Sequence, residues 1–512
     1  MNLQVIKNRI AKILAYTVTA ILFVFISTFL ILQIPPVQNY FIGKFLKNFT
    51  AVTGFTTTVE GFRMLWFDRL ELERVAVIDP EGNKMISART ILINFKLSQL
   101  FEKKNVNIDG IYLDSAHVLL TKVLEPDSLR DLNINVFIAN INAHYGGSSG
   151  GGGNPPKINI GEAFINQSQF SYINQDRDTV PRGFDYNHFS LSVDEGQLNS
   201  FVILGDTTEF NVNTLIAQDL KTKFRVNQLS TFFRHCQTSM EFVGLEVHAG
   251  ESVISDTVIF KFNGNRELNE FVDKVLIHAN LRNTTIYPKD LEFFAPGVER
   301  IEQAIKLEGV FDGRVNKFKY TDMKIDVGNT HLMGSIDMDG LPNINETFMV
   351  VNLRNSHVDP NDLAFLFNEN TLKRLLPMGR MQLDGEFLGY PTDFVAKGKF
   401  SGSLGDVTSD INFKVNEKDF DRSMYSGHLS LSDFDLGRYL NDTVLFQRVS
   451  MDGQVIGSGL TKLTADFRLD GHVYSVGLKG YNYRNIVTNA RLTSELSAGM
   501  IDIDDPNLQI KA

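Results

Sequence analysis

Residues 70–95 read LELERVAVIDPEGNKMISARTILINF. Leucines alternate with glutamates at positions 70–73, and apolar residues again occupy every second position at 91–95. Alternation with period two is typical of a strand with one face in water and one face against apolar material. The DPEGN segment between them, residues 79–83, has the residue types that favour a turn. The stretch therefore predicts two strands joined by a turn.

The same alternation continues through most of the chain after residue 55, whereas segments with helical spacing are few and short. This pattern predicts a mainly β chain: one transmembrane helix, then an elongated, curled antiparallel sheet (a β-taco, or repeating β-groove) with short helices interspersed. At about 11 residues per strand and turn, the sheet would contain on the order of 40 strands. The alternative is a string of β-sandwiches or rolls, because an apolar sheet face is normally buried against a second layer.

The N-terminal segment 13–34 is uncharged and long enough to cross a bilayer. Lys7, Arg9 and Lys12 precede it, so residues 1–12 are expected to form a cytoplasmic tail. A cleaved signal peptide is the alternative, although the segment is long for one and no small-residue cleavage pattern follows it. The residues expected to form the anchor are Ile13, Leu14, Ile21, Leu22, Phe23, Val24, Phe25, Ile26, Phe29, Leu30, Ile31 and Leu32.

Residues 35–143 are expected to form a first β region that begins with a short amphipathic helix at 37–53. That helix would lie either on the membrane surface or against the first strands. The segment 144–156, HYGGSSGGGGNPP, is predicted to be a flexible loop. It is not a phosphate-binding loop, because Pro155 and Pro156 stand where such a loop carries Gly-Lys-Ser/Thr at the start of a helix.

Strand patterns resume at 157–284, and an internal repeat of about 72 residues follows in 285–512, with units starting near 285, 357 and 430. Each unit contains two glycines four residues apart, in GVFDG, GEFLG and GQVIG. Phe318 and Phe394 follow the second glycine of their units at equal distance. A fixed period of this kind predicts stacked units that contact only their neighbours.

The apolar side of these strands is the candidate functional surface. If few helices cover it, a curled sheet forms a trough that is apolar inside and polar outside. Such a trough suits acyl chains, since burying hydrocarbon contributes roughly 0.8 kcal/mol per methylene. Phospholipids are therefore the expected cargo. The residues expected to line the groove are Phe260, Phe262, Met323, Ile325, Val327, Ile411, Phe413, Val415, Phe467 and Leu469.

Other classes of function find little support. A net charge of −10 argues against nucleic acid as a partner, and the single cysteine, Cys236, permits no intrachain disulfide or cysteine-based metal cluster. The histidines form no recognisable metal-binding motif. The segments DMDG (337–340) and DIDD (502–505) begin like calcium loops but lack the glutamate that closes such a loop. We therefore expect no enzyme activity, no metal and no cofactor.

The N-terminal part resembles the AsmA-like superfamily, most closely the TamB-type subunits of the translocation and assembly module. The resemblance covers roughly residues 10–125. It rests on the anchor and on three segments: LQIPPVQNYFIGKFLKNFTAVTGFTTTVEGF, DRLELERVAVIDPEGNKMISARTILINF and VNIDGIYLDSAHVLL. The last segment places Ile108, Gly110, Ile111 and Leu113 in a family-like strand.

The resemblance implies a single-pass inner-membrane protein whose bulk lies in the periplasm of a Gram-negative-type bacterium. It implies phospholipid transport toward the outer membrane in support of outer-membrane biogenesis, with a barrel partner of the TamA/BamA type. The alternative it leaves open is a scaffold or chaperone for the insertion and secretion of outer-membrane proteins. TamB-type chains are usually longer and have a characteristic C-terminal region, so this chain is expected to be a shorter relative or a fragment.

Overall fold

The computed structural model describes residues 3–65, 68–96, 105–124, 130–145, 157–294, 301–366, 372–373, 375–493, 495 and 497–512. Hydrogen bonding links 25 strands into a curled sheet, which confirms the predicted fold class. The expected number of strands, about 40, was wrong because many strands are longer than assumed, up to 20 residues in β4 (Asn105–Leu124). Strands β4 and β6 (Lys157–Ile173) run parallel, in contrast to the antiparallel pairing of β2 with β3 and of β3 with β4.

The chain divides into two compact units, which we describe separately. Unit 1 comprises residues 1–236 and 247–250, and unit 2 comprises residues 237–246 and 251–512. Strand β10 (Ser239–Ala249) contributes residues to both.

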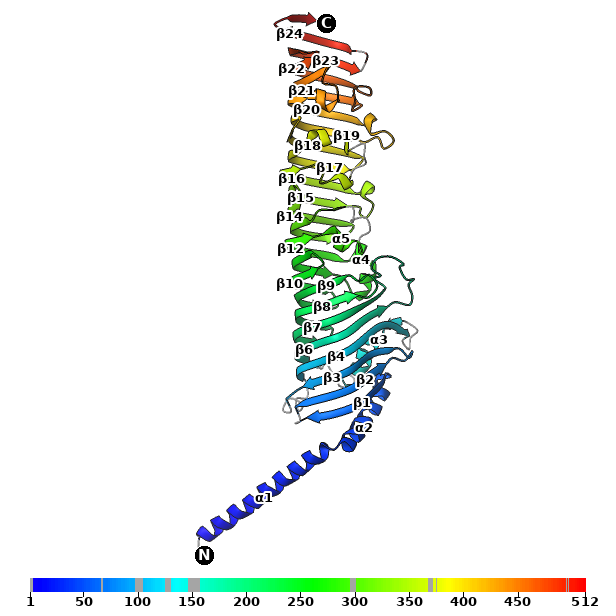
Figure 1. Cartoon of the computed structure of the whole chain (residues 1–512), viewed down its shortest axis with the longest axis vertical. Coiled ribbons are helices and arrows are strands. Elements are labelled where there is room, and N and C mark those ends of the chain that lie inside the picture. The colour runs from blue at the N-terminus through cyan, green and yellow to red at the C-terminus, as the bar shows by residue number, and fades with distance from the viewer. Residues whose placement is uncertain are drawn as a thin grey trace. The chain divides into compact units, whose positions relative to one another are not determined.

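The N-terminal helices of unit 1 are α1 (Leu3–Leu32) and α2 (Pro35–Thr53), shown in Figure 1. Within α1, residues 12–31 have a mean hydropathy of 2.3 and none of them is buried, so α1 is long and apolar enough to cross a membrane. Two prolines start α2, where their missing N–H groups cost nothing. The helix ends at Gly54, which adopts a left-handed φ of 72°.

The strands of unit 1 confirm the hairpin predicted for residues 70–95. In this hairpin, β2 pairs with β3 and Asp79 accepts hydrogen bonds from the backbone N–H groups of Glu81 and Asn83 in the turn. The strands are β1 (Thr56–Leu65), β2 (Arg69–Ile78), β3 (Lys84–Asn94), β4, β5 (Arg130–Leu132), β6, β7 (His188–Leu204), β8 (Thr207–Asp219) and β9 (Arg225–His235).

Helix α3 (Asn133–Tyr145) covers part of the apolar side of the first strands. Its Phe137 packs edge-on against Phe55 with ring centroids 5.0 Å apart, and together they bury Val77 and Met85. The fully buried Asn133 donates a hydrogen bond to the carbonyl oxygen of Leu119. The predicted loop at 144–156 overlaps the end of α3, and its residues 146–156 lie outside the described residues.

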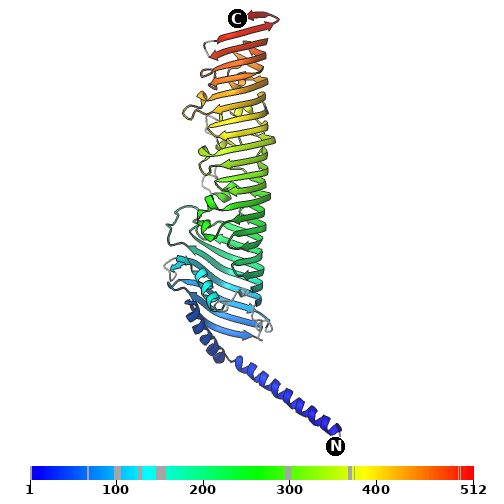
Figure 2. The same ribbon diagram turned by 180° about the vertical axis from the view of Figure 1, so that it is seen from behind.

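Unit 2 is built from strands of nine to thirteen residues, apart from the four-residue β25, and from very short helices. The connecting loops lie together on one side, on the right in Figure 1 and on the left in Figure 2. The strands are β11 (Ser252–Lys261), β12 (Leu276–Ile286), β13 (Ile305–Arg314), β14 (Lys317–Val327), β15 (Thr330–Asp339), β16 (Phe348–Val358), β17 (Met381–Tyr390), β18 (Asp393–Gly402), β19 (Gly405–Lys414), β20 (Met424–Asp435), β21 (Phe446–Ser458), β22 (Asp466–Leu478), β23 (Tyr481–Thr493), β24 (Ser497–Asp505) and β25 (Leu508–Lys511). The helices are α4 (Phe271–Lys274), α5 (Pro288–Leu291) and α7 (Leu436–Tyr439).

The predicted repeat has a structural counterpart in sets of four strands, β13–β16, β17–β20 and β21–β24. The two glycines of each repeat lie on the first strand of each set. The phenylalanine noted in the sequence stands opposite the second glycine: Phe318 faces Gly313, and Phe394 faces Gly389. A β-carbon at Gly389 would lie 2.4 Å from the Asp393 carbonyl oxygen, so the backbones meet at a distance that only glycine permits.

The strands of unit 2 bend at β-bulges that recur from strand to strand. At each bulge a non-glycine residue adopts the left-handed conformation and the register shifts. An extra residue of this kind increases the local bend and twist of a strand. These residues are Asp256, Asn283, Asp322, Asn355 and Asp433.

Candidate functional site

Two rows of apolar residues cross the sheet of unit 2 perpendicular to the strands, and we call the face that carries them the apolar face. Row 1 contains Phe260, Ile277, Gly313, Phe318, Met338, Met349, Gly389, Phe394, Phe413, Tyr425, Gly457, Phe467 and Leu492. Row 2 contains Val258, Ala279, Phe311, Tyr320, Ile336, Val351, Phe387, Ala396, Ile411, Gly427, Val455, Leu469 and Ala490. Each residue in a row is the cross-strand partner of the next, so the rows run from β11 to β23 without a charged side chain, and the hydroxyls of Tyr320 and Tyr425 are their only polar side-chain groups.

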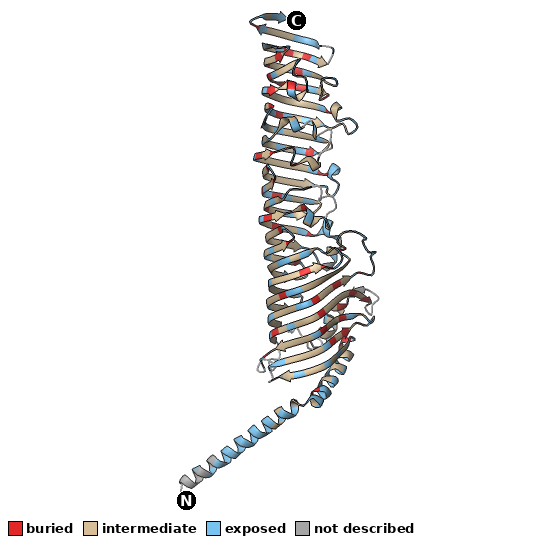
Figure 3. Cartoon of the chain, viewed as in Figure 1, coloured by how far each residue is buried: buried red, intermediate tan, exposed pale blue. Residues whose placement is uncertain are grey.

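The side chains of the two rows are mostly half-buried between β13 and β19, and intermediate burial also prevails along these strands in Figure 3. All apolar side chains of the two rows in these strands are partly exposed, with the single exception of Tyr320, which is 8% exposed. Strands β14–β19 have their main contacts with their sheet neighbours, and no second sheet packs on them within the described residues. The alternative of successive sandwiches was therefore wrong for this part of the chain.

Aromatic rings contact each other along the rows. The rings of Phe387 and Phe394 stack with centroids 4.5 Å apart, and Phe394 lies 5.4 Å from Phe413 on the next strand. Phe311 and Phe318 repeat the first of these contacts one repeat earlier, also at 4.5 Å. These rings offer a smooth surface of hydrocarbon with few polar atoms.

The opposite face carries cross-strand ion pairs. Lys397 lies 3.1 Å from Asp410, and Lys414 lies 3.7 Å from Asp393. Further pairs join β14 to its neighbours on both sides: Lys319 with Asp337, and Lys324 with Glu308. Exposed pairs of this kind contribute about 0–1 kcal/mol each to the stability of the fold. Their main effect is therefore to make this face of the sheet hydrophilic.

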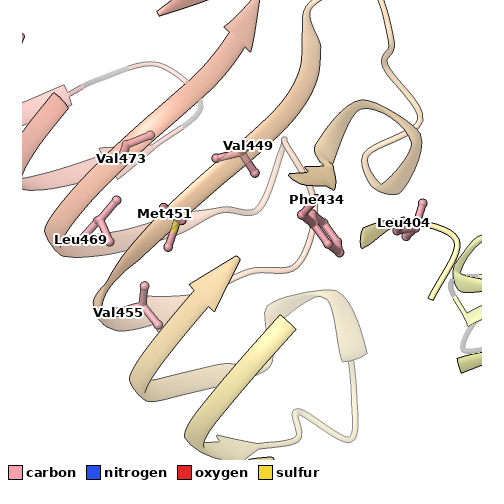
Figure 4. Packing of buried hydrophobic residues seen from close by; sticks show 7 residues of the cluster. All are labelled: Leu404, Phe434, Val449, Met451, Val455, Leu469 and Val473. Carbon is pink, nitrogen blue, oxygen red and sulfur yellow. The ribbon is translucent and has the colours of Figure 1, made fainter. Parts of the chain in front are cut away.

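At β20–β22 the apolar face is filled by the protein's own side chains (Figure 4). Leu469 and Val455 are each 4% exposed, and Met451 is 8% exposed. The partly buried Met378 and Leu436, both on short helical segments, pack against this cluster. The buried residues of the cluster are Leu404, Phe434, Val449, Met451, Val455, Leu469 and Val473.

Tyr425 shows how closely the two ends of these strands approach. Its hydroxyl donates a hydrogen bond to the carbonyl oxygen of Gly459, which follows β21. Burial raises the pKa of Tyr425 to about 12, and Tyr439 and Asp466 add to the shift. Tyr439 lies on α7, beyond the opposite end of β20, and both tyrosines pack against the cluster, so the curl of the sheet brings the two ends of β20 to it.

An ion pair joins the loops at the two ends of β21. Asp442, in the loop before β21, accepts a hydrogen bond from Lys462, in the loop after it, with 2.9 Å between Nζ and Oδ2. A straight strand of 13 residues would separate its ends by roughly 40 Å. The contact therefore requires β21 to curl around the apolar face. The hydrogen bond from Lys462 lowers the pKa of Asp442.

The ten residues predicted to line the groove lie on the apolar face or on its continuation past a bulge or a strand end. They differ in burial. Phe262, Met323, Val327 and Leu469 are buried and serve packing within the protein. The other six are half-buried: Phe260, Ile325, Ile411, Phe413, Val415 and Phe467.

Sequence analysis missed several members of the rows, including Phe311, Phe387, Met338 and Met349. Phe311 and Phe387 each lie between the two glycines of a repeat. On a strand, the residue two positions after a glycine points to the same face as the glycine. The alternation within GVFDG and GEFLG therefore contained the signal.

Within the described residues, no group of three or more His, Cys, Asp or Glu side chains could hold a metal ion. The acids of DMDG instead pair with lysines, Asp337 with Lys319 and Asp339 with Lys317. In DIDD, Asp505 accepts a hydrogen bond from the Tyr481 hydroxyl, which lowers the pKa of Asp505.

No family model, curated protein or solved structure matches this chain. The resemblance of residues 10–125 to the AsmA-like superfamily rests on the segments quoted above, and it remains a prediction.

Proposed function

We propose that this protein carries phospholipids along the apolar face of its curled sheet, from the inner membrane toward the outer membrane. The observation that carries the proposal is the pair of continuous apolar rows, whose side chains, apart from the buried Tyr320, stay partly exposed from β13 to β19. A monomeric protein rarely leaves so large an apolar surface without an occupant. Acyl chains are long, flexible and apolar, so they match a surface that extends over many strands.

The energetics favour a continuous path for such a cargo. Two acyl chains of ~16 carbons are held in a bilayer by tens of kcal/mol, at roughly 0.8 kcal/mol per methylene. A route through water would cost most of that free energy. Along the rows the next strand lies only about 4.8 Å away, so hydrocarbon remains in contact with hydrocarbon at every step.

The membrane arrangement of the proposal follows from α1. A helix of this length and hydropathy would anchor the chain in the inner membrane. Lys7, Arg9 and Lys12 would keep the N-terminus cytoplasmic and leave the sheet in the periplasm. An outer-membrane barrel of the TamA/BamA type as the receiving partner rests on the family resemblance.

Site-specific photo-crosslinking in cells tests the proposal. A photoreactive residue at Phe413, on the apolar face, should capture phospholipid. The same residue at Lys414 is the matched control, because adjacent strand residues point to opposite faces and Lys414 pairs with Asp393 on the ionic face. Equal labelling at both positions would contradict the proposal. Capture of unfolded outer-membrane proteins without lipid at Phe413 would favour the scaffold function instead.

A further inference from the structure

Helix α2 has an inner face that packs against the protein and an outer face that stays exposed within the described residues. On the inner face, Gln38 and Thr53 are buried and the Phe49 ring packs edge-on against Phe137 of α3, with centroids 6.0 Å apart. The Thr53 carbonyl oxygen accepts a hydrogen bond from Asn140 of α3 at 2.7 Å. These contacts fix α2 against α3, and the Thr50 hydroxyl oxygen accepts a hydrogen bond from the Thr57 backbone N–H of β1.

The outer face of α2 carries three large aromatic side chains. Tyr40, Phe41 and Phe45 are 67%, 57% and 55% exposed. A helix held only by its packing on the sheet would carry polar residues there. Lys44 and Lys47 accompany the rings, and residues 35–53 contain no acidic side chain. The outer face thus combines exposed aromatic surface with positive charge.

The connection to α1 restricts what can cover this face. The apolar stretch ends at Ile31 and α2 begins at Pro35, so few residues separate them. From Pro35 to Phe45 the helix rises about 15 Å. The interfacial layer is roughly 5–8 Å thick on each side of a bilayer, so a helix perpendicular to the membrane would carry Phe45 beyond it. Tyr40 and Phe45 can therefore both reach the membrane only if α2 lies along its surface.

We propose that the outer face of α2 lies in the headgroup region of the membrane that α1 crosses, with Tyr40, Phe41 and Phe45 inserted among the lipids. Tyrosine, which has an apolar ring and a polar hydroxyl, concentrates in this region, and phenylalanine is typical of the apolar face of helices that lie there. Lysines in this region attract anionic headgroups. Because α2 packs on β1, this contact holds the first strand of the sheet at the membrane surface. The inference rests on the anchoring part of the proposed function and is independent of lipid transport.

Depth-dependent fluorescence quenching of the full-length protein in lipid nanodiscs tests the inference. Trp66 is first replaced by phenylalanine, and Phe41→Trp or Phe45→Trp is then introduced as the only tryptophan. Lipids brominated near the headgroup end of their acyl chains should remove most of the fluorescence, and lipids brominated near the chain ends should remove little. Tyr186→Trp is the matched control, because Tyr186 is a comparably exposed aromatic of unit 1 outside α2, and its fluorescence should persist.

A tryptophan in α1 distinguishes a failure of the inference about α2 from a failure of the membrane anchor. Phe25→Trp should be quenched most by bromine at the chain ends, since Phe25 lies within the apolar stretch. Quenching of Phe25→Trp with none at Phe41→Trp or Phe45→Trp would overturn the inference for α2 alone. Loss of quenching at Phe25→Trp as well would overturn the anchor. In nanodiscs of anionic lipid, the double change Lys44→Gln and Lys47→Gln should reduce quenching at Phe41→Trp and leave that at Phe25→Trp unchanged.

Discussion

Asn355 adopts a left-handed φ of 48° at the point where the register between β16 and β17 shifts. Before this point the odd-numbered residues of β16 face the apolar side, as Val351 does, and after it the even-numbered Val358 is buried. One residue therefore reverses which positions face inward. Asn and Asp tolerate this conformation better than other side chains, which explains their recurrence at the bulges.

Gly389 is a residue at which we expect a single added methyl group to destabilise the protein. Its φ is 137°, and an added β-carbon would lie 2.4 Å from the Asp393 carbonyl oxygen. We expect Gly389→Ala to lower the free energy of unfolding by about 1–3 kcal/mol, the usual cost of such backbone strain. Denaturant unfolding of the purified protein would measure it. Gly43→Ala in α2 is the control, since nothing lies within 4 Å of its added β-carbon; an equal loss in both variants would contradict the expectation.

At the scale of elements, the loops at the ends of β21 are held together by the pair of Asp442 and Lys462. We expect Asp442→Ala to speed amide hydrogen exchange in residues 459–465, because their link to the opposite loop is lost. Thermal stability should change little, since pairs near the surface contribute about 0–1 kcal/mol. Glu417→Ala, at an exposed acid of the loop after β19, is the matched control.

The pH dependence of this pair has a definite sign. Lys462 lowers the pKa of Asp442, so the stabilisation is present above the ordinary aspartate pKa. It is lost as the pH falls through the lowered value. After correction for the slower intrinsic exchange at low pH, the protection factors of residues 459–465 should therefore fall under acidic conditions in the native protein and respond less in Asp442→Ala. Unchanged exchange in the variant at neutral pH would show that the loops are held by other contacts.

At the scale of the whole molecule, the expectation concerns lipid carried by the chain. The protein extracted in mild detergent should retain several phospholipids, which native mass spectrometry would count. Phe413→Asp places a charge on the apolar face beside Phe394 and should reduce the count. Lys414→Asp, on the ionic face, should leave it unchanged. Equal lipid content in the two folded variants would mean that the apolar face is not where the lipid binds.

The strand pattern, the apolar N-terminal helix and the identity of the apolar face were accessible from the sequence. They depend on local alternation, and alternation is a property of neighbours along the chain. The glycines of the repeat were also visible, and the structure explains them by the close approach of Gly389 to Asp393. The bulges were harder to see, although the apolar positions switch from even to odd around Asp322 and from odd to even around Asn355, and these switches contained the signal.

The sequence by itself thus determined that this chain forms an apolar N-terminal helix followed by an amphipathic sheet, because apolar residues at every second position share one face in a strand. Only the tertiary structure decided which part of the apolar face is covered by the protein's own side chains and which part stays partly exposed. Leu469 and Phe413 have the same alternation, yet Leu469 is buried in the cluster of β20–β22 and Phe413 stays half-exposed. The difference arises from contacts between strand ends far apart in the sequence, such as Asp442 with Lys462, and local pattern contains no information about them.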